Sequence, residues 1–308
     1  MTTIPAGTRV VVVGHSGFVG QHVMRLFEAR LPRGTDLVGR SWPTVDLTQE
    51  SSVAALAGEM DAQTVLIVCA GIKRQWGDTL EIFEQNLKLA TNLHRLLQQA
   101  PARRVLYFSS AAVYGEERHN AAITEETPVQ PTSLYGLGKY ASEGLLRQAL
   151  KGRAGAPSLV CLRPTLIYGP GDQSLGYGPS GFVHSAVVGE PLVLWGDGSE
   201  RRGFAFVGDV AEAVWRLAFT DFAGAVNVTG PEGATFGELV TIVQRLAPHP
   251  LEVKTRPRSK PQVDHVYTST RLQTLCPDLV FTSLEKGIGL TYEAARLAGE
   301  LKEPAGAG

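Results

Sequence analysis

The stretch that most constrains the fold is Arg9–Gly20, where a β-branched run is followed at once by three regularly spaced glycines. Arg9–Val13 predicts a buried strand, and the residues after the glycines predict an amphipathic helix. Gly14 permits a tight turn, Gly17 lets a pyrophosphate approach backbone N–H groups, and Gly20 lets the helix pack on the strand. A strand, a glycine turn and a helix in this order predict a dinucleotide-binding unit. The spacing is Gly-x-x-Gly-x-x-Gly rather than Gly-x-Gly-x-x-Gly, which points to one branch of such proteins.

Strand-like and helix-like segments continue to alternate through the first half of the chain. Strands are expected near 36–39, 64–71, 104–110 and 157–162, and helices near 79–99 and 133–152. Because parallel strands need long crossover connections, this alternation predicts an α/β protein with a doubly wound, parallel, Rossmann-type sheet.

From about residue 163 the sequence becomes richer in glycine and proline, which predicts a smaller, mixed C-terminal substrate lobe. We expect a dinucleotide-binding domain over 1–165, with segments that return to its sheet at about 202–228. The substrate-binding lobe is expected over 166–201 and 229–308. Asp209 follows the first returning segment and is expected to cap the next helix.

Composition argues against several classes of function. The chain of 308 residues is 44% hydrophobic and 19% charged, and its net charge of −1 offers no overall field for nucleic acid or an anionic membrane. Cys69, Cys161 and Cys276 lack disulfide or metal-ligand spacing, as do the seven histidines, so free thiols and no metal site are expected. Neither a signal-peptide core nor a bilayer-length apolar run is present, which favours a cytoplasmic enzyme or binding protein.

Tyr135 and Lys139 stand four positions apart in a predicted helix, so they share one face about one turn apart. A phenol with a pKa of about 10 is a poor acid–base group at neutral pH, and a neighbouring ammonium lowers that pKa. The pair therefore suits proton transfer to a carbonyl oxygen. On its own, the same spacing also describes an ordinary surface pair.

Five motifs occur in a characteristic order. They are Gly14-x-x-Gly17-x-x-Gly20, Ser109-Ser-Ala-Ala-Val-Tyr-Gly115, Tyr135-x-x-x-Lys139, Arg163-Pro-x-x-x-Tyr-Gly-Pro-Gly171 and Arg202-x-Phe-x-x-Val-x-Asp209. In this order they resemble the motifs of the extended short-chain dehydrogenase/reductases, and most of all those of nucleotide-sugar 4-ketoreductases and 4-epimerases. The resemblance covers almost the whole chain, to the segment that begins at Ser283.

This resemblance implies roles for the central residues. Tyr135 would be the acid–base group, Lys139 would lower its pKa and bind the nicotinamide ribose, and Ser110 would hydrogen-bond the reacting oxygen. Ser109 is the alternative serine. Asn86 matches an asparagine of the family's fourth helix, where the role is either structural or catalytic.

The expected cofactor is NADP(H), with NAD(H) as the alternative. Arg40 and Ser41 stand at the end of the second strand, where a preference for NAD usually places a carboxylate, and Arg40 is either a partner for a 2′-phosphate or an exposed arginine. His15 and Ser16 resemble the loop of NADPH-using sugar reductases. Asp46 either lies near the adenine or caps a helix. The full set of expected cofactor-binding residues is Gly14, Ser16, Gly17, Phe18, Val19, Gly20, Arg40, Ser41, Asp46, Leu47, Ala70, Tyr135 and Lys139.

The substrate residues implied by the resemblance are Ser110, Ala111, Arg202 and Arg256. The two arginines resemble those that clamp the diphosphate of a nucleotide sugar, a task that suits a planar guanidinium. Surface ion pairs are the other interpretation of both. Thr165 stands where many epimerases carry an asparagine.

Ala111 and Ala112 occupy the two positions where dehydratases of this group carry an acidic pair. Dehydration is therefore not expected. The predicted reaction is the NADPH-dependent reduction of the 4-keto group of a nucleoside-diphosphate 4-keto-6-deoxyhexose. A 4-epimerase that retains NAD is the alternative, and a non-catalytic redox-sensing protein of the same fold is the third hypothesis. A homodimer through the helices at about 79–99 and 133–152 is also expected.

Overall fold

The large sheet is parallel and six-stranded, as the alternation of strands and helices predicts. The computed structural model describes residues 4–117, 119–153, 155, 157–174, 177–231, 233–258 and 261–300. Within them the strand order is β11-β6-β4-β3-β1-β2. The bounds are β1 Arg9–Val13, β2 Asp36–Arg40, β3 Thr64–Val68, β4 Arg104–Phe108, β6 Ser158–Pro164 and β11 Gly224–Val228.

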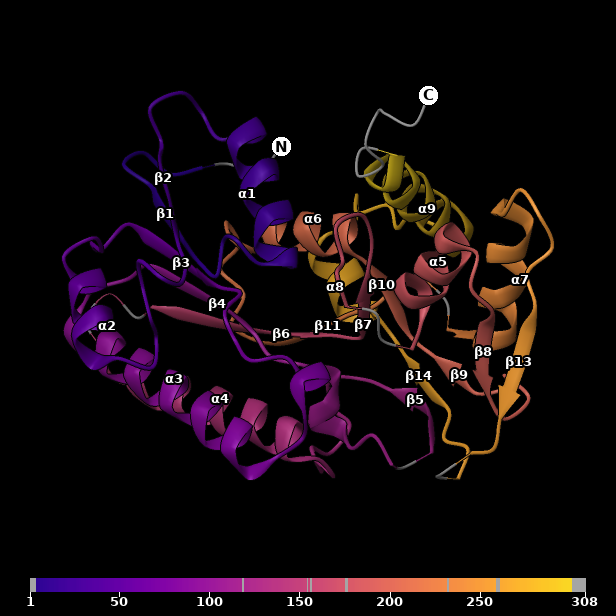
Figure 1. Ribbon diagram of the computed structural model, residues 1–308. Coiled ribbons are helices and arrows are strands. Elements are labelled where there is room, and N and C mark those ends of the chain that lie inside the picture. The colour runs from indigo at the N-terminus through magenta and orange to yellow at the C-terminus, as the bar shows by residue number, and fades with distance from the viewer. Residues whose placement is uncertain are drawn as a thin grey trace.

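Helices cover both faces of this sheet (Figure 1). Successive strand residues point to opposite faces, so β1 supplies Val10 and Val12 to one core and Val11 and Val13 to the other. The first core is completed by α1 Phe18–Arg30, α6 Val207–Leu217 and α8 Thr270–Leu275. The second is completed by α2 Glu50–Ala57, α3 Leu80–Gln99 and α4 Leu134–Leu150. The α/β, doubly wound expectation is confirmed.

A smaller lobe lies beside the sheet, at the right of Figure 1, and mixes helices with short strand pairs. Its helices are α5 Pro179–Val188, α7 Phe236–Leu246 and α9 Leu284–Glu300, which share a core around Phe182, Leu239 and Ile288. β8 Leu192–Trp195 pairs with β13 Val253–Arg256, and β9 Arg201–Arg202 pairs with β12 Ala234–Thr235. None of the helices in the described ranges is long and apolar enough to cross a membrane.

Two strand pairs connect segments that are far apart in sequence. β5 Asn120–Ile123 pairs in parallel with β14 His265–Tyr267. β7 Leu166–Tyr168 pairs in parallel with β10 Phe204–Phe206. Of the segments expected to return to the large sheet, β11 joins it, whereas β10 does not. The domain boundary at residue 165 stays a prediction.

Asp209 does not cap its helix, so that prediction is wrong. Helix α6 begins at Val207, and its N-cap Phe206 makes no side-chain capping bond. The Asp209 carboxylate instead accepts hydrogen bonds from the backbone N–H of Thr282 at 2.7 Å and from its hydroxyl at 2.8 Å. Asp209 thus fastens the segment before α9 to α6, across 73 positions of sequence.

Candidate active site

The glycine turn has the geometry that its spacing predicts. Gly14 has φ of +85°, and a Cβ there would lie 2.6 Å from the Ala70 nitrogen. A Cβ at Gly20 would lie 2.1 Å from the Gly14 carbonyl oxygen. Gly17 is the N-cap of α1, and its missing Cβ would meet only the Gly14 oxygen, at 3.4 Å. The first-turn N–H groups, those of Phe18, Val19 and Gly20, have no intrahelical partner, so the turn is a backbone-lined cradle that fits a diphosphate.

Arg40 is already paired at the end of β2. Its Nε lies 3.0 Å from Glu59 Oε1, and its Nη2 lies 2.9 Å from Glu59 Oε2. Ser41 faces the glycine turn instead, because its Oγ accepts a hydrogen bond from Ser16 N at 3.0 Å and contacts His15 Nδ1 at 2.9 Å. The structure therefore brings Ser41, Ser16 and His15 together and ties Arg40 to Glu59.

Asp46 and Leu47 shape the connection after β2. Asp46 Oδ1 accepts hydrogen bonds from the hydroxyl and the N–H of Thr48, which lower the pKa of its carboxyl. Helix α2 begins later, with Gln49 as its N-cap, so Asp46 does not cap it. The Leu47 side chain is buried in the core beneath, and its carbonyl oxygen accepts from Asn92 at 2.8 Å.

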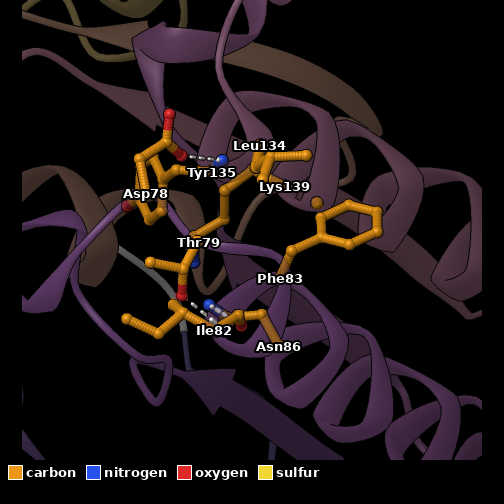
Figure 2. Close-up of a pocket in the computed structure, with 9 residues that line it drawn as sticks. Asp78, Thr79, Ile82, Phe83, Asn86, Leu134, Tyr135 and Lys139 are labelled. Atoms are coloured by element: carbon orange, nitrogen blue, oxygen red, sulfur yellow. Dashed lines mark hydrogen bonds between the residues drawn. The ribbon is translucent and has the colours of Figure 1, made fainter.

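Helix α4 carries Tyr135 and Lys139 into the site and is fixed at its N-terminus by two side chains. Ser133 Oγ accepts from Gly136 N at 3.1 Å, and Asp78 Oδ1 accepts from Tyr135 N at 2.8 Å (Figure 2). Lys139 Nζ lies 5.8 Å from the Tyr135 ring centroid and donates to the Phe108 carbonyl oxygen at 2.7 Å. The two residues share one face, and the helix period predicts this.

Two glycines of α4 bring the helix close to its neighbours. A Cβ at Gly136 would lie 2.5 Å from the Ala112 carbonyl oxygen, in the short 3-10 helix Ala111–Tyr114. A Cβ at Gly138 would lie 3.2 Å from the Phe83 ring of α3. Gly136 therefore keeps Tyr135 beside the segment that follows β4.

Burial sets the pKa values of both groups. Burial raises the pKa of Tyr135 to about 12, and a hydrogen bond with Ser110 opposes this rise. Burial lowers the pKa of Lys139 to about 8. The other charges that act on the Tyr135 phenol are those of Glu116 and Arg74, and the lowering of its pKa by Lys139 stays a prediction.

The two adjacent serines point to different partners. Ser110 caps the 3-10 helix by accepting from Ala112 N at 3.1 Å, and it is the serine that hydrogen-bonds Tyr135. Ser109 is buried and donates to Glu143 Oε1 at 2.6 Å. The structure brings Ser110, Tyr135 and Lys139 together and leaves Ser109 in the interior.

A buried network lies directly beneath this group. Glu143 and Arg163 are both buried and form two bonds, from Nε to Oε1 at 2.9 Å and from Nη2 to Oε2 at 2.7 Å. Arg163 also donates to the Tyr114 hydroxyl at 2.9 Å, and Tyr114 donates to Asn227 Oδ1 at 2.8 Å. The bonds with Glu143 outweigh the cost of burial and raise the pKa of Arg163. The sequence analysis did not single out Glu143, although it stands four positions after Lys139.

Asn86 braces the loop that follows β3. Its Oδ1 accepts from Ile72 N at 2.9 Å, and its Nδ2 donates to the Ile72 and Ile82 carbonyl oxygens at 3.2 Å each. All three bonds join the Asn86 side-chain amide to backbone groups, which is a structural role. Within the described residues, no group of His, Cys, Asp or Glu side chains could hold a metal ion.

The predicted substrate arginines do not converge. Arg202 pairs with Glu200, whereas Arg256 lies on exposed β13 with its guanidinium 6.0 Å from the Trp195 ring centroid. Arg258 shares Glu200 with Arg202. Arg258 ends the tract Arg256-Pro-Arg258 and was not among the predicted substrate residues. In an extended segment, residues two apart face the same way, so the tract alone did not distinguish them.

Comparisons with known proteins agree with this geometry. The model of a family described as "NAD dependent epimerase/dehydratase family" matches residues 10–228. A dTDP-4-dehydro-6-deoxy-D-allose reductase of a Streptomyces species is 27% identical over 282 residues, which cover 82% of this chain and 85% of the relative. UDP-glucuronic acid decarboxylase 2 of Arabidopsis thaliana is 27% identical over 276 residues, with 82% of this chain matching 60% of that protein.

A solved structure gives the same result for the fold. The UDP-glucose 4-epimerase of Thermus thermophilus in complex with NAD has a TM-score of 0.81 and 27% identity, over 94% of this chain and 99% of that one. The family model covers the glycine turn, Ser110, the Tyr135–Lys139 pair and the return strand β11. The chain therefore belongs to the NAD dependent epimerase/dehydratase family of extended short-chain dehydrogenase/reductases and is a nicotinamide-dependent enzyme.

Proposed function

We propose that the protein reduces the 4-keto group of a nucleoside-diphosphate 4-keto-6-deoxyhexose with NADP(H). The observation that carries this proposal is the assembled group of Ser110, Tyr135 and Lys139, in which the Tyr135 phenol hydrogen-bonds Ser110 and its ring lies 5.8 Å from Lys139 Nζ. A phenol with a pKa of about 10 or higher is protonated at neutral pH. A protonated phenol is set to donate a proton, which reduction of a ketone requires. The similarity to a dTDP-4-dehydro-6-deoxy-D-allose reductase supports the same direction.

A nicotinamide cofactor held by the glycine turn and Lys139 would supply the hydride that reduction of the keto carbon requires. As the carbonyl oxygen gains negative charge, Ser110 donates a hydrogen bond to it and Tyr135 transfers its phenolic proton, which leaves a hydroxyl group on the sugar. Lys139, held by its bond to the Phe108 carbonyl, would bind the nicotinamide ribose. The cradle at Gly14 to Gly20 would hold the pyrophosphate.

Two alanines support reduction or epimerisation over dehydration. Ala111 and Ala112 are buried at the start of the 3-10 helix, where a dehydratase needs an acid and a base. Neither side chain can carry a proton. Among these neighbours, only Ser110 and Tyr135 could therefore donate a hydrogen bond or a proton to the reacting oxygen.

The second candidate is an NAD-dependent nucleotide-sugar 4-epimerase. It is favoured by the similarity to a UDP-glucose 4-epimerase and by the ion pair that occupies Arg40. The preference for NADP(H) rests on Ser41 and His15, and on Arg40 once Glu59 releases it. A non-catalytic redox-sensing role is opposed by the assembled group of Ser110, Tyr135 and Lys139, and failure of turnover across a broad nucleotide-sugar panel would revive it.

Arg202 and Arg258 are the best-placed groups for the substrate diphosphate. Both guanidinium groups meet at Glu200. Arg256 stays a prediction, since its side chain lies on the exposed strand β13.

Removal of the phenolic proton should abolish reduction. We expect Tyr135→Phe to lower kcat by about 100-fold or more, since positioned acid–base groups contribute factors of this size, and Ser110→Ala to lower it strongly. Ser109→Ala is the matched control for Ser110→Ala, and it should alter stability more than turnover. Steady-state assays with a panel of nucleoside-diphosphate 4-keto sugars, with cofactor affinity measured in parallel, check this. Near wild-type turnover by Tyr135→Phe would contradict the assignment.

The cofactor separates the two candidate reactions. We expect the purified protein to release no dinucleotide on denaturation and NADPH to raise its melting temperature more than NADH does. Glu59→Gln should enlarge the NADPH preference because it frees Arg40, and Arg40→Ala should reduce it. Absorbance and mass spectrometry of the released fraction, with thermal shifts, measure this. Stoichiometric NAD(H) in that fraction would favour the epimerase.

The buried amine of Lys139 should make stability depend on pH. Its pKa is about 8 in the folded protein and 10.5 in the reference state, so between these values the unfolded chain binds a proton that the folded protein lacks. Unfolding free energy therefore rises with pH across this window, and the cost of burial is full below pH 8, at about 3 kcal/mol. Lys139→Met should stabilise the protein by up to that amount at pH 7 and by less at pH 9.5.

Urea unfolding at both pH values measures this dependence. Lys88→Met, on the exposed side of α3, is the matched control and should change stability little at either pH. An equal gain for Lys139→Met at pH 7 and pH 9.5 would contradict the assigned pKa.

We also infer a homodimer through α3 and α4, where Leu80, Leu137 and Tyr140 are exposed. Leu145 of the predicted stripe is half-buried, and Leu146 and Leu150 belong to the core. Light scattering should give a dimer for the wild type and a monomer for Leu137→Glu. Leu290→Glu, at a leucine of similar exposure on α9 (46% against 44%), should remain dimeric. A monomeric wild type would end this proposal.

A further inference from the structure

Glu200 lies between two arginines and uses one carboxylate oxygen for each. Oε1 pairs with Arg202 Nη2, and Oε2 pairs with Arg258 Nη1. The side chains of Arg202, Glu200 and Arg258 are 18%, 19% and 20% exposed, so the three charges are largely removed from water. Arg202 also donates to the Val263 carbonyl oxygen. A bridging carboxylate in this position is screened less by water than a surface ion pair is.

The local backbone is built to admit the Arg258 side chain. Gly196 has φ of +65°, and a Cβ there would lie 2.3 Å from Arg258 Nε and 3.0 Å from its Cγ. The Gly196 N–H also donates to the Arg256 carbonyl oxygen at 2.8 Å, which sets β13 beside the turn. Any side chain at position 196 would therefore clash with Arg258, which packs directly against the Gly196 backbone.

An aromatic residue borders the three charges. Charges on Glu200, Arg258 and Arg202 all influence the pKa of the Tyr177 phenol, which burial raises. Tyr177 stacks on Phe236 with ring centroids 4.1 Å apart, and its hydroxyl accepts a hydrogen bond from Trp195 N at 3.2 Å. The site thus joins two guanidinium groups to a partly exposed aromatic side chain.

The arginines around the bridge are already paired before any ligand arrives. Arg201 adds a third guanidinium, and Asp197, Asp264 and Glu238 add three carboxylates. Asp197 lies 3.5 Å from Arg258, and Asp264 accepts from Arg201 N at 2.8 Å. A single-charged anion that replaces Glu200 at one arginine leaves the other still paired with the carboxylate. A ligand with two adjacent phosphate groups offers one to each arginine.

We propose that Glu200 occupies the arginine pair in the free protein and yields it to the diphosphate of the substrate. This inference rests on the proposed assignment of Arg202 and Arg258 to the substrate diphosphate. Glu200 makes binding an exchange of one anion for another, so affinity for every anion is lowered. A diphosphate presents one phosphate group to each arginine and so replaces both of the ion pairs that Glu200 gives up.

The test compares Glu200→Gln with the wild type by calorimetric titration of dTDP, dTMP, UDP, UMP and inorganic pyrophosphate. Saturating NADP⁺ is present throughout so that the glycine cradle is filled. Glu200→Gln keeps the side-chain shape and removes the competing charge, so it should bind dTDP, UDP and pyrophosphate about tenfold more tightly. The gain for dTMP and UMP, which offer one phosphate group to the two arginines, should be no larger. Asp197→Asn is the matched control. It removes one charge from a side chain that is 75% exposed and should change affinity less than twofold.

Unchanged or weaker binding by a folded Glu200→Gln variant would overturn the inference, because the carboxylate would then serve to orient the arginines. The aspartate of Glu200→Asp is shorter and reaches one arginine only, so this variant should show an intermediate gain in diphosphate affinity. It tests the inference if Glu200→Gln does not fold. If pyrophosphate binding tightens while no nucleotide binds, the role of Glu200 stands and the substrate class fails. If nucleoside diphosphates bind the wild type and Glu200→Gln shows no gain, the substrate class stands and the role of Glu200 fails.

Discussion

The geometry of the proposed active site depends on the buried ion pair between Glu143 and Arg163. Removing one member of such a pair typically costs about 3–5 kcal/mol, because the other charge is left buried without a partner. Here the pair joins α4, which carries Lys139, to β6 of the large sheet. Ser109 and Tyr114 attach the segment after β4 to the same two charges. The position of Ser110 relative to the helix therefore follows from interactions one layer below it.

The features that the sequence predicted well are those set by short-range geometry. The glycine turn follows from backbone clashes that only Gly14 and Gly20 avoid. The shared face of Tyr135 and Lys139 follows from the period of a helix. The six-stranded parallel sheet follows from alternating apolar strands and helices. Each of these can be predicted from a local sequence pattern, although the contact that requires a glycine at position 14 is with Ala70, after β3.

The features that the sequence predicted poorly depend on partners distant in the chain. Glu59 pairs with Arg40, 19 positions away in the sequence, and Thr282 hydrogen-bonds Asp209, 73 positions away. Arg258 meets Glu200 across 58. A charged side chain chooses among many partners, and only the folded backbone decides which lies within reach. The pKa of Tyr135 is a related case, because the sequence displays the neighbouring amine but not the depth of burial, and burial has the larger effect.

The pairing of β5 with β14 has a consequence for the order in which the protein is made. β5 lies in the connection between Ser110 and Tyr135, yet its only strand partner in the described residues is β14, near the end of the chain. A ribosome that has released Ser110 and Tyr135 must still add about 130 more residues before this connection acquires its sheet partner. The connection between the two proposed catalytic residues thus stays without its sheet partner long after its own residues have emerged.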